Sequence, residues 1–203
     1  MKFSTLVTLS LTAVSSTLAA PMRENLFARA LSPGDSNCIP YFKYEGIYHS
    51  TYEQSCVNLV RDCKSKVVNT TSDIWGVKSC VAAATCQGVI PLIAQIQCTE
   101  GGSVPDAPET ESLDYNIYAG IVGDCAWQEG GCPITQQNYI DFIYGALSEI
   151  GTTSWPNRPY PLFFSSVDNV ITNWWDYLKV WTATGETVPY LNLNDWLHYS
   201  NSS

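Results

Sequence analysis

Hydrophobic residues recur at helical spacing in the first third of the chain. Between residues 52 and 68, apolar residues and two cysteines recur at spacings of three, four and seven: Cys56, Leu59, Val60, Cys63 and Val67. Such a repeat places its members on one face of an α-helix. We therefore predict an amphipathic helix whose buried face carries both cysteines.

Two further helical segments are predicted directly after it. Ser72 is a suitable N-cap for a helix that begins near Asp73 and continues to Gly88. Pro91 lacks the amide hydrogen that a continuing helix needs, so we expect a separate short helix over residues 91–98. With the helix before them, these segments would form a first module of three short helices cross-linked by three disulfides.

Two longer helices that pack together are predicted in the second half. The first follows the N-cap Thr135, covers residues 136–150 and ends at Gly151. The second follows the N-cap Ser166 and ends before Gly185. Its expected buried stripe consists of Val167, Ile171, Trp174, Leu178 and Trp181, with Trp175 beside the stripe and partly exposed.

The C-terminal tail has a weaker pattern. Residues 188–193 are apolar and rich in asparagine, and we interpret them as an extended stretch. Asn194 or Asp195 would then cap a last helical turn.

The N-terminus has the pattern of a secretory signal peptide. A basic residue at Lys2 is followed by an apolar run, and small residues precede Pro21. The segment 21–29, which ends in Arg29, is either a propeptide or an unstructured tail. No other stretch is long and apolar enough to predict a membrane span.

The 203 residues correspond to one domain or two small ones. We predict a mainly α fold, with short disulfide-clamped helices followed by a small aromatic-rich helical part with long loops. The expected division is a signal peptide 1–20, a propeptide 21–29, a disulfide-rich helical module 30–98, a linker or exposed loop 99–112, and an acidic aromatic-rich helical module 113–203 that is separate or forms one domain with 30–98.

Charge is concentrated in the second half. The whole chain has a net charge of -9, and from Thr99 onward only Arg158 and Lys179 oppose the acidic residues. A chain of this charge lacks the basic surface that nucleic acids require, so binding to nucleic acid is excluded as a main activity. The acidity fits solubility, a cationic partner or an acidic extracellular setting.

The eight cysteines predict disulfides rather than a metal site. An exported chain with an even number of cysteines forms a disulfide framework, and neither a Cys-x-x-Cys motif nor a histidine cluster is present. We predict no metal and no cofactor. Cys125 and Cys132 are expected to close a local loop, whereas the pairing of the other six is open among fifteen connectivities: Cys38, Cys56, Cys63, Cys80, Cys86 and Cys98.

A proline-rich loop over residues 155–164 collects aromatic side chains. Flat rings with amides and carboxylates nearby suit stacking on sugars, and the candidate glycan-binding residues are Trp155, Tyr160, Phe163 and Phe164. Alternatively, these rings fill the gap between helices. Two Asn-x-Ser/Thr acceptors for glycosylation begin at Asn69 and Asn201.

Residues for catalysis are not evident. The Gly-x-Ser-x-Gly elbow of serine hydrolases is missing, and we expect structural roles for the two histidines, His49 and His198. A glycoside hydrolase needs two carboxylates, and the candidates near aromatic residues are Asp124, Glu129, Asp141 and Asp176.

A leader that ends Leu18-Ala19-Ala20, a short segment through Arg29, eight cysteines and an acidic aromatic body make the layout similar to small secreted cysteine-rich proteins of filamentous fungi. That resemblance implies an effector, a lectin-like glycan binder or a toxin, and it identifies no functional residue. We expect a secreted protein that acts without catalysis by binding an extracellular or host protein or glycan. The alternatives are a lectin-like carbohydrate-binding protein and a small carboxylate-dependent glycoside hydrolase.

Overall fold

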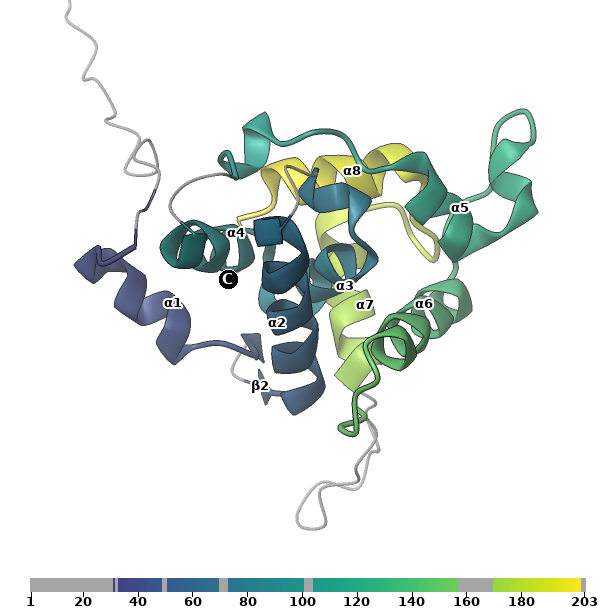
Figure 1. Cartoon of the computed structure of the whole chain (residues 1–203). Coiled ribbons are helices and arrows are strands. Elements are labelled where there is room, and N and C mark those ends of the chain that lie inside the picture. The colour runs from purple at the N-terminus through teal and green to yellow at the C-terminus, as the bar shows by residue number, and fades with distance from the viewer. Residues whose placement is uncertain are drawn as a thin grey trace, which may run out of the picture.

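The structure is a computed structural model that describes residues 31, 33–48, 51–69, 73–100, 104–156 and 170–201. It is mainly helical, as predicted (Figure 1). Disulfides clamp the helices of the first half. The helices are α1 (Ile39–Lys43), α2 (Gln54–Asn69), α3 (Lys78–Gln87), α4 (Val89–Glu100), α5 (Tyr115–Val122), α6 (Gln136–Glu149), α7 (Val170–Thr182) and α8 (Tyr190–Tyr199). Single 3-10 turns are η1 (Ser36–Cys38), η2 (Ile74–Gly76), η3 (Ala107–Glu109) and η4 (Asp124–Trp127). The strands β1 (Ile47–Tyr48) and β2 (Thr51–Tyr52) form a short antiparallel hairpin.

Helix α3 is the centre of the molecule. Every residue from Ser79 to Gln87 is buried, and α2, α4, α6 and α7 all contact this helix (Figure 1). Small residues make this possible, because the run Val81-Ala82-Ala83-Ala84 lets neighbouring helices approach the backbone from several sides. One buried cluster therefore contains residues from both halves of the chain.

Two disulfides fasten α2 to α3. The predicted apolar face of α2 is confirmed, since all five of its members are buried. Cys56 pairs with Cys86 and Cys63 with Cys80, so both cysteines of α2 point into the core. The remaining pairs are Cys38–Cys98, which ties η1 to α4, and Cys125–Cys132, the predicted local loop.

The boundaries of α3 differ from the sequence prediction. Asp73, rather than Ser72, is the capping residue: its carboxylate accepts the amide of Trp75 and caps η2, and α3 starts only at Lys78. The break before α4 falls at Gly88, whose φ of 89° is readily adopted only by glycine. Pro91 lies in the first turn of α4, where a missing amide hydrogen costs no helical bond.

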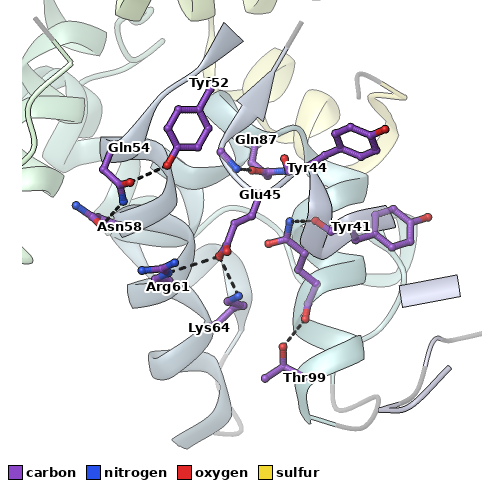
Figure 2. A network of polar contacts seen from close by, with 12 residues as sticks. Tyr41, Tyr44, Glu45, Tyr52, Gln54, Asn58, Arg61, Lys64, Gln87 and Thr99 are labelled. Carbon is purple, nitrogen blue, oxygen red and sulfur yellow. Dashed lines mark hydrogen bonds and ion pairs between the residues drawn. The ribbon is translucent and has the colours of Figure 1, made fainter. Parts of the chain in front are cut away.

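Buried glutamines hold residues 33–48, which we call the N-terminal arm, against α3 and α4 (Figure 2). The side-chain amide of Gln87 accepts a hydrogen bond from the backbone N–H of Gly46 at 2.5 Å and donates to the carbonyl of Tyr44 at 3.2 Å. Gln95 donates to the carbonyl of Tyr41 at 2.7 Å. These bonds supply the partners that the irregular backbone of the arm lacks.

An ion pair adds to the same contact. Glu45 accepts from Lys64 at 3.1 Å, and both side chains are mostly buried (Figure 2). Arg61 approaches the same carboxylate at 4.0 Å from the exposed surface of α2. The arm is thus joined to α2, α3 and α4.

The described part of the segment 99–112, the predicted linker or exposed loop, alternates exposed residues with buried ones that contact the core. Residues 99 and 100 belong to α4, and Val104, Ala107 and Thr110 are buried. Gln97 donates to the carbonyl of Val104 at 3.1 Å and to the Asp106 carboxylate at 3.0 Å. The few apolar residues among the Gly, Pro and acidic residues determine where the segment lies.

Helices α6 and α7 pack together as predicted, and the N-cap Thr135 forms a capping box with Asn138. The buried stripe of α7, however, is rotated from the expected one. Trp175 is fully buried, and Trp181 is 39% exposed. The observed stripe has the spacing four, three, four: Ile171, Trp175, Leu178 and Thr182, with Trp174 also buried. Ser166 and Val167 lie outside the described residues.

Helix α8 begins at Tyr190, so the prediction of an extended stretch over residues 188–193 is wrong beyond Pro189. Val188 alone pairs in a bridge with Ile134 before the helix starts. Among the described helices, none by itself is long and apolar enough to cross a membrane; α3 and α4 reach that length only as a pair bent by 119°.

Candidate binding site

The predicted glycan-binding residues are only partly within the described chain. Trp155 is 41% exposed and its ring stacks on Tyr144, with 6.0 Å between ring centroids. Tyr160, Phe163 and Phe164 lie outside the described residues. Of the glycosylation acceptors, Asn69 ends α2 and Asn201 is exposed after α8; use of either site stays a prediction.

The carboxylates suggested for hydrolysis are exposed and belong to different parts of the fold. Asp124 is in η4 and Glu129 follows it. Asp141 on α6 accepts from Gln137, and Asp176 on α7 pairs with Lys179. The structure therefore gives no support for a shared site at these four residues.

A different group of aromatic residues, the tyrosine–tryptophan cluster, forms where α5, η4 and α8 meet. It consists of Tyr115, Tyr118, Trp127 and Tyr190. The Tyr115 ring is in the middle: its centroid lies 4.9 Å from that of Trp127 and 5.2 Å from that of Tyr190. Trp127 is 62% exposed, so much of its indole remains available to a ligand, while its inner side rests on the Tyr115 ring.

The three tyrosines of the cluster are fixed through their hydroxyl groups. Tyr115 donates to the carbonyl of Ala126 at 2.6 Å, and Tyr190 donates to that of Leu113 at 2.6 Å. Tyr118 donates to the carbonyl of Cys132. Burial raises the pKa of Tyr118 and of Tyr190, so both hydroxyls stay protonated donors well above neutral pH.

The loop that carries Trp127 is closed by the Cys125–Cys132 disulfide. The Tyr115 and Tyr118 hydroxyls bond to carbonyls within this same loop, at Ala126 and at Cys132. The exposed indole is thus held by one covalent and two polar attachments, which limits the conformational entropy that a ligand would have to remove on binding.

Three carboxylates lie beside the cluster, and we call them the acidic group: Asp73, Glu111 and Asp114. Asp73 caps η2, and Asp114 caps α5 by accepting the amide of Asn116 at 2.6 Å. The second oxygens of the two aspartates lie 3.6 Å and 3.9 Å from the point where a Cβ atom on Gly76 would be. Both oxygens therefore border the same exposed position above a glycine.

Burial raises the pKa of the Asp73 carboxyl above its ordinary value. The hydrogen bond from the Trp75 amide opposes this shift, while repulsion from Glu111 and Asp114 adds to it and attraction to His198 lowers it. The same carboxylates act on Tyr190, because repulsion from Asp114 and Asp73 adds to the effect of burial in raising the pKa of its hydroxyl. Each resolved pKa shift in the described chain belongs to the cluster or to the acidic group.

The acidic group has no Lys or Arg partner in the described part of the chain. Five of the described cations pair with other carboxylates, and Lys43 lies over the ring of Tyr44. The pairs are Arg61 and Lys64 with Glu45, Lys66 with Asp62 and Glu149, Lys78 with Glu149, and Lys179 with Asp176 and Glu186. The carboxylates of the acidic group therefore keep acceptor capacity for a ligand.

His198 is buried behind the acidic group, on α8. Its ring nitrogens contact backbone carbonyls only, namely those of Asn194, Thr110 and Glu111. His49 lies outside the described residues. Within the described ranges, no set of His, Cys, Asp and Glu side chains is arranged to hold a metal ion.

Sequence reasoning missed this site because its parts are far apart along the chain. Tyr115 and Tyr118 have helical spacing and follow a capping aspartate, which is a local signal. Tyr190 reaches Leu113 across 77 residues and Asp73 comes from the first half, and neither has such a signal.

Comparisons with known proteins identify no relative: the chain matches no family model, no curated protein and no solved structure.

Proposed function

We propose that this protein is secreted and acts without catalysis by binding an extracellular or host component, and that the component is a carbohydrate bound at the tyrosine–tryptophan cluster. The exposed Trp127 indole, supported by Tyr115 on a disulfide-closed loop, carries the proposal. Tryptophan is a frequent anchor of binding sites, and a ring that is already held in place loses little conformational entropy when a ligand binds.

The chemistry of the surroundings supports a sugar. The apolar C–H face of a pyranose ring stacks on an indole, while its hydroxyls need hydrogen-bond acceptors and donors at the ring edge. The free oxygens of Asp73 and Asp114 are acceptors, and the Asn116 side chain, bonded to Asp114 at 3.0 Å, lies with them. Stacking and polar groups thus occur at one place.

The cysteines support secretion. Every cysteine is in a disulfide, including the three bridges that clamp the first half. Stable disulfides form in oxidising compartments. Together with the signal-peptide pattern of residues 1–20, they support an exported protein.

A glycan array with the secreted protein tests the proposal. We expect binding that falls about tenfold or more in Trp127→Ala, the loss typical of an aromatic anchor. Trp155→Ala is the matched control, because it removes an exposed tryptophan that stacks on Tyr144 outside the cluster. Loss in Trp155→Ala with retention in Trp127→Ala would move the site to the 155–164 loop, and an array without binding contradicts the proposal.

One observation favours a second candidate function, glycoside hydrolysis. Asp73 and Asp114 direct one oxygen each toward the position above Gly76, and burial raises the pKa of Asp73, as a general acid requires. Incubation with polysaccharides, followed by assay of new reducing ends, separates the two functions. Product that disappears in both Asp73→Asn and Asp114→Asn would establish hydrolysis and overturn binding without catalysis.

A further inference from the structure

The Cys125–Cys132 disulfide differs from the other three bridges in its access to solvent. The six cysteines of the first half are buried, each with at most 4% of its surface exposed. Cys125 and Cys132 are both partly exposed. Most residues around them are fully exposed: Gly123, Asp124, Trp127, Gln128, Glu129, Gly130 and Pro133. A thiol can therefore approach this bridge while the helices of the core stay packed.

The space beside the bridge is open. A Cβ atom added to Gly123 or to Gly130, each two residues before a cysteine of the bridge, would meet no other atom of the described chain within 4 Å. An incoming thiolate must reach one sulfur of a disulfide, so access governs the rate of exchange. We infer that Cys125–Cys132 is a site of thiol–disulfide exchange with small dithiols, and that its reduction releases residues 125–132, the tryptophan loop.

The exchange proceeds in two balanced steps. A thiolate of the dithiol attacks one sulfur of the bridge, the protein S–S bond breaks, and one cysteine leaves as a thiolate that takes a proton from water. The second thiol of the reagent then loses its proton and attacks the reagent's own sulfur in the mixed disulfide, which displaces the other cysteine. The bridge has gained two electrons and two protons, and the dithiol has become a cyclic disulfide.

The fold accommodates the reduced cysteines. The sulfur of Cys125 lies 3.1 Å from the carbonyl oxygen of Val122, and the sulfur of Cys132 lies 4.0 Å from the same oxygen. Val122 is the last residue of α5, where carbonyls have no partner within the helix. Once reduced, Cys125 carries an S–H that can donate to this carbonyl. A weak polar contact thus takes the place of the covalent one.

Reduction removes the covalent attachment of the tryptophan loop. Two hydrogen bonds remain, from Tyr115 to Ala126 and from Tyr118 to Cys132. Each contributes about 0.5–1.5 kcal/mol net, so they hold the loop far less firmly than a bridge does. The other disulfides fasten η1, α2, α3 and α4, and the tryptophan loop belongs to none of these elements. We therefore expect the loop to become mobile while the helical core stays folded.

Charge in the loop selects among reductants. Asp124 and Glu129 are the charged residues of the stretch 123–133, and both are exposed. Like charges repel, so a reagent with a net negative charge of its own, such as glutathione, is disfavoured beside them. Dithiothreitol carries no charge apart from its attacking thiolate. The expected reactant is thus an uncharged small dithiol.

Differential alkylation of the full secreted protein tests the exchange site without any ligand. The native protein is treated with dithiothreitol, free thiols are blocked with iodoacetamide, and peptide mass spectrometry identifies the modified cysteines. We expect Cys125 and Cys132 to be modified about tenfold or more faster than any cysteine of the first half, and more slowly with glutathione at equal thiol concentration. Equal rates for all bridges, or no reduction without denaturant, would overturn the inference, and faster reaction with glutathione contradicts the selection by charge.

The double variant Cys125→Ser/Cys132→Ser is the matched control. It should take up no iodoacetamide under conditions that modify the wild type, and its core should still unfold cooperatively because the three buried bridges remain. Modification of this variant at the wild-type rate would place the reactive bridge in the first half and contradict the assignment. If the variant does not fold, the rates measured on the unmodified chain decide.

Brief digestion with chymotrypsin, which cleaves after accessible aromatic residues, tests the release of the loop. Reduction under native conditions should speed cleavage after Trp127 about tenfold or more, because proteolysis follows the population of open forms. Tyr44 is the internal control: it is 50% exposed in the N-terminal arm, which the buried Cys38–Cys98 bridge fastens, and cleavage there should not change. Unchanged cleavage after Trp127 in the reduced protein contradicts the release.

The effect on the ligand rests on the proposed function, and it is measured separately. We expect glycan binding to fall about threefold or more when Cys125–Cys132 is reduced and to recover on reoxidation, because a mobile indole loses more conformational entropy on binding. Equal binding by the oxidised and reduced forms overturns the coupling between bridge and site. Absence of any glycan binding, together with selective reduction of this bridge, overturns the proposed function and leaves the exchange site standing.

Discussion

The indole nitrogen of Trp75 donates a 2.8 Å hydrogen bond to the hydroxyl oxygen of Thr110 inside the core. The same hydroxyl donates to the carbonyl of Ala107 at 2.7 Å, so both of its bonding directions are used. Trp75 comes from the turn before α3 and Thr110 from the segment after α4. This side-chain bond therefore attaches a polar segment to the central helix layer.

Removal of the Thr110 hydroxyl should leave the Trp75 indole N–H buried without an acceptor. We expect Thr110→Val to lower the free energy of unfolding by about 1–3 kcal/mol, the cost of an unsatisfied buried donor. Urea denaturation followed by tryptophan fluorescence measures this change. Thr110→Ser keeps the hydroxyl and should lose much less; equal losses in the two variants would show that the methyl group matters and the hydrogen bond does not.

The rotated stripe of α7 predicts opposite outcomes for two tryptophans. Trp175 is fully buried and its ring lies 5.2 Å from that of Tyr139 on α6, so Trp175→Ala should cost about 3–5 kcal/mol. Trp181 is partly exposed, and Trp181→Ala should cost about 1 kcal/mol or less. Thermal unfolding of both variants checks the order. A larger loss in Trp181→Ala would restore the stripe that the sequence predicts.

The raised pKa of the Asp73 carboxyl predicts that the protein is more stable at acidic than at neutral pH with respect to this group. The folded state holds the proton of this carboxyl to a higher pH than the unfolded chain does, so stability falls as the pH rises above the ordinary value of 3.8. Asp73→Asn cannot ionise and still accepts the Trp75 amide. Its melting temperature should exceed that of wild type at pH 7, and this advantage should vanish at pH 3.

Asp73→Ala is the matched variant for the cap. It removes the acceptor for Trp75 and should be less stable than Asp73→Asn by about 1 kcal/mol at both pH 7 and pH 3, since neither variant ionises. A melting temperature of Asp73→Asn below that of wild type at pH 7 would contradict the expectation, because it would mean that attraction to His198 exceeds the cost of burying the ionised carboxylate.

Local patterns predicted the elements whose burial is decided within a few turns. The face of α2 and the cap of α6 agree with the structure, because apolar spacing and capping chemistry act within a single helix. On α7 the pattern was ambiguous, since Trp174 and Trp175 are adjacent and both are buried. Packing against α3 and α6 decides which side of this helix turns inward, and that information lies outside the helix.

Local sequence patterns could not predict the candidate site either, because its residues come together only in the complete fold. The hydroxyl bond from Tyr190 to Leu113 and the approach of Asp73 to Asp114 depend on how α8 and η2 are placed by the whole fold. The composition of residues 155–164 instead directed attention to aromatic residues that are close in sequence. Within the candidate site, proximity in sequence and proximity in space coincide for Tyr115 and Tyr118 on α5 and for Trp127 in its disulfide loop.

The order of the cysteines in the first half has a consequence for how the chain can oxidise. The pairs 63–80, 56–86 and 38–98 are nested, each enclosing the one before, with sequence separations of 17, 30 and 60 residues. The entropy lost on closing a loop grows with its length, and an inner bridge shortens the path that the next one must close. The bridges can thus form in the order 63–80, 56–86 and 38–98. In that order, no chain end has to pass through a ring that is already closed.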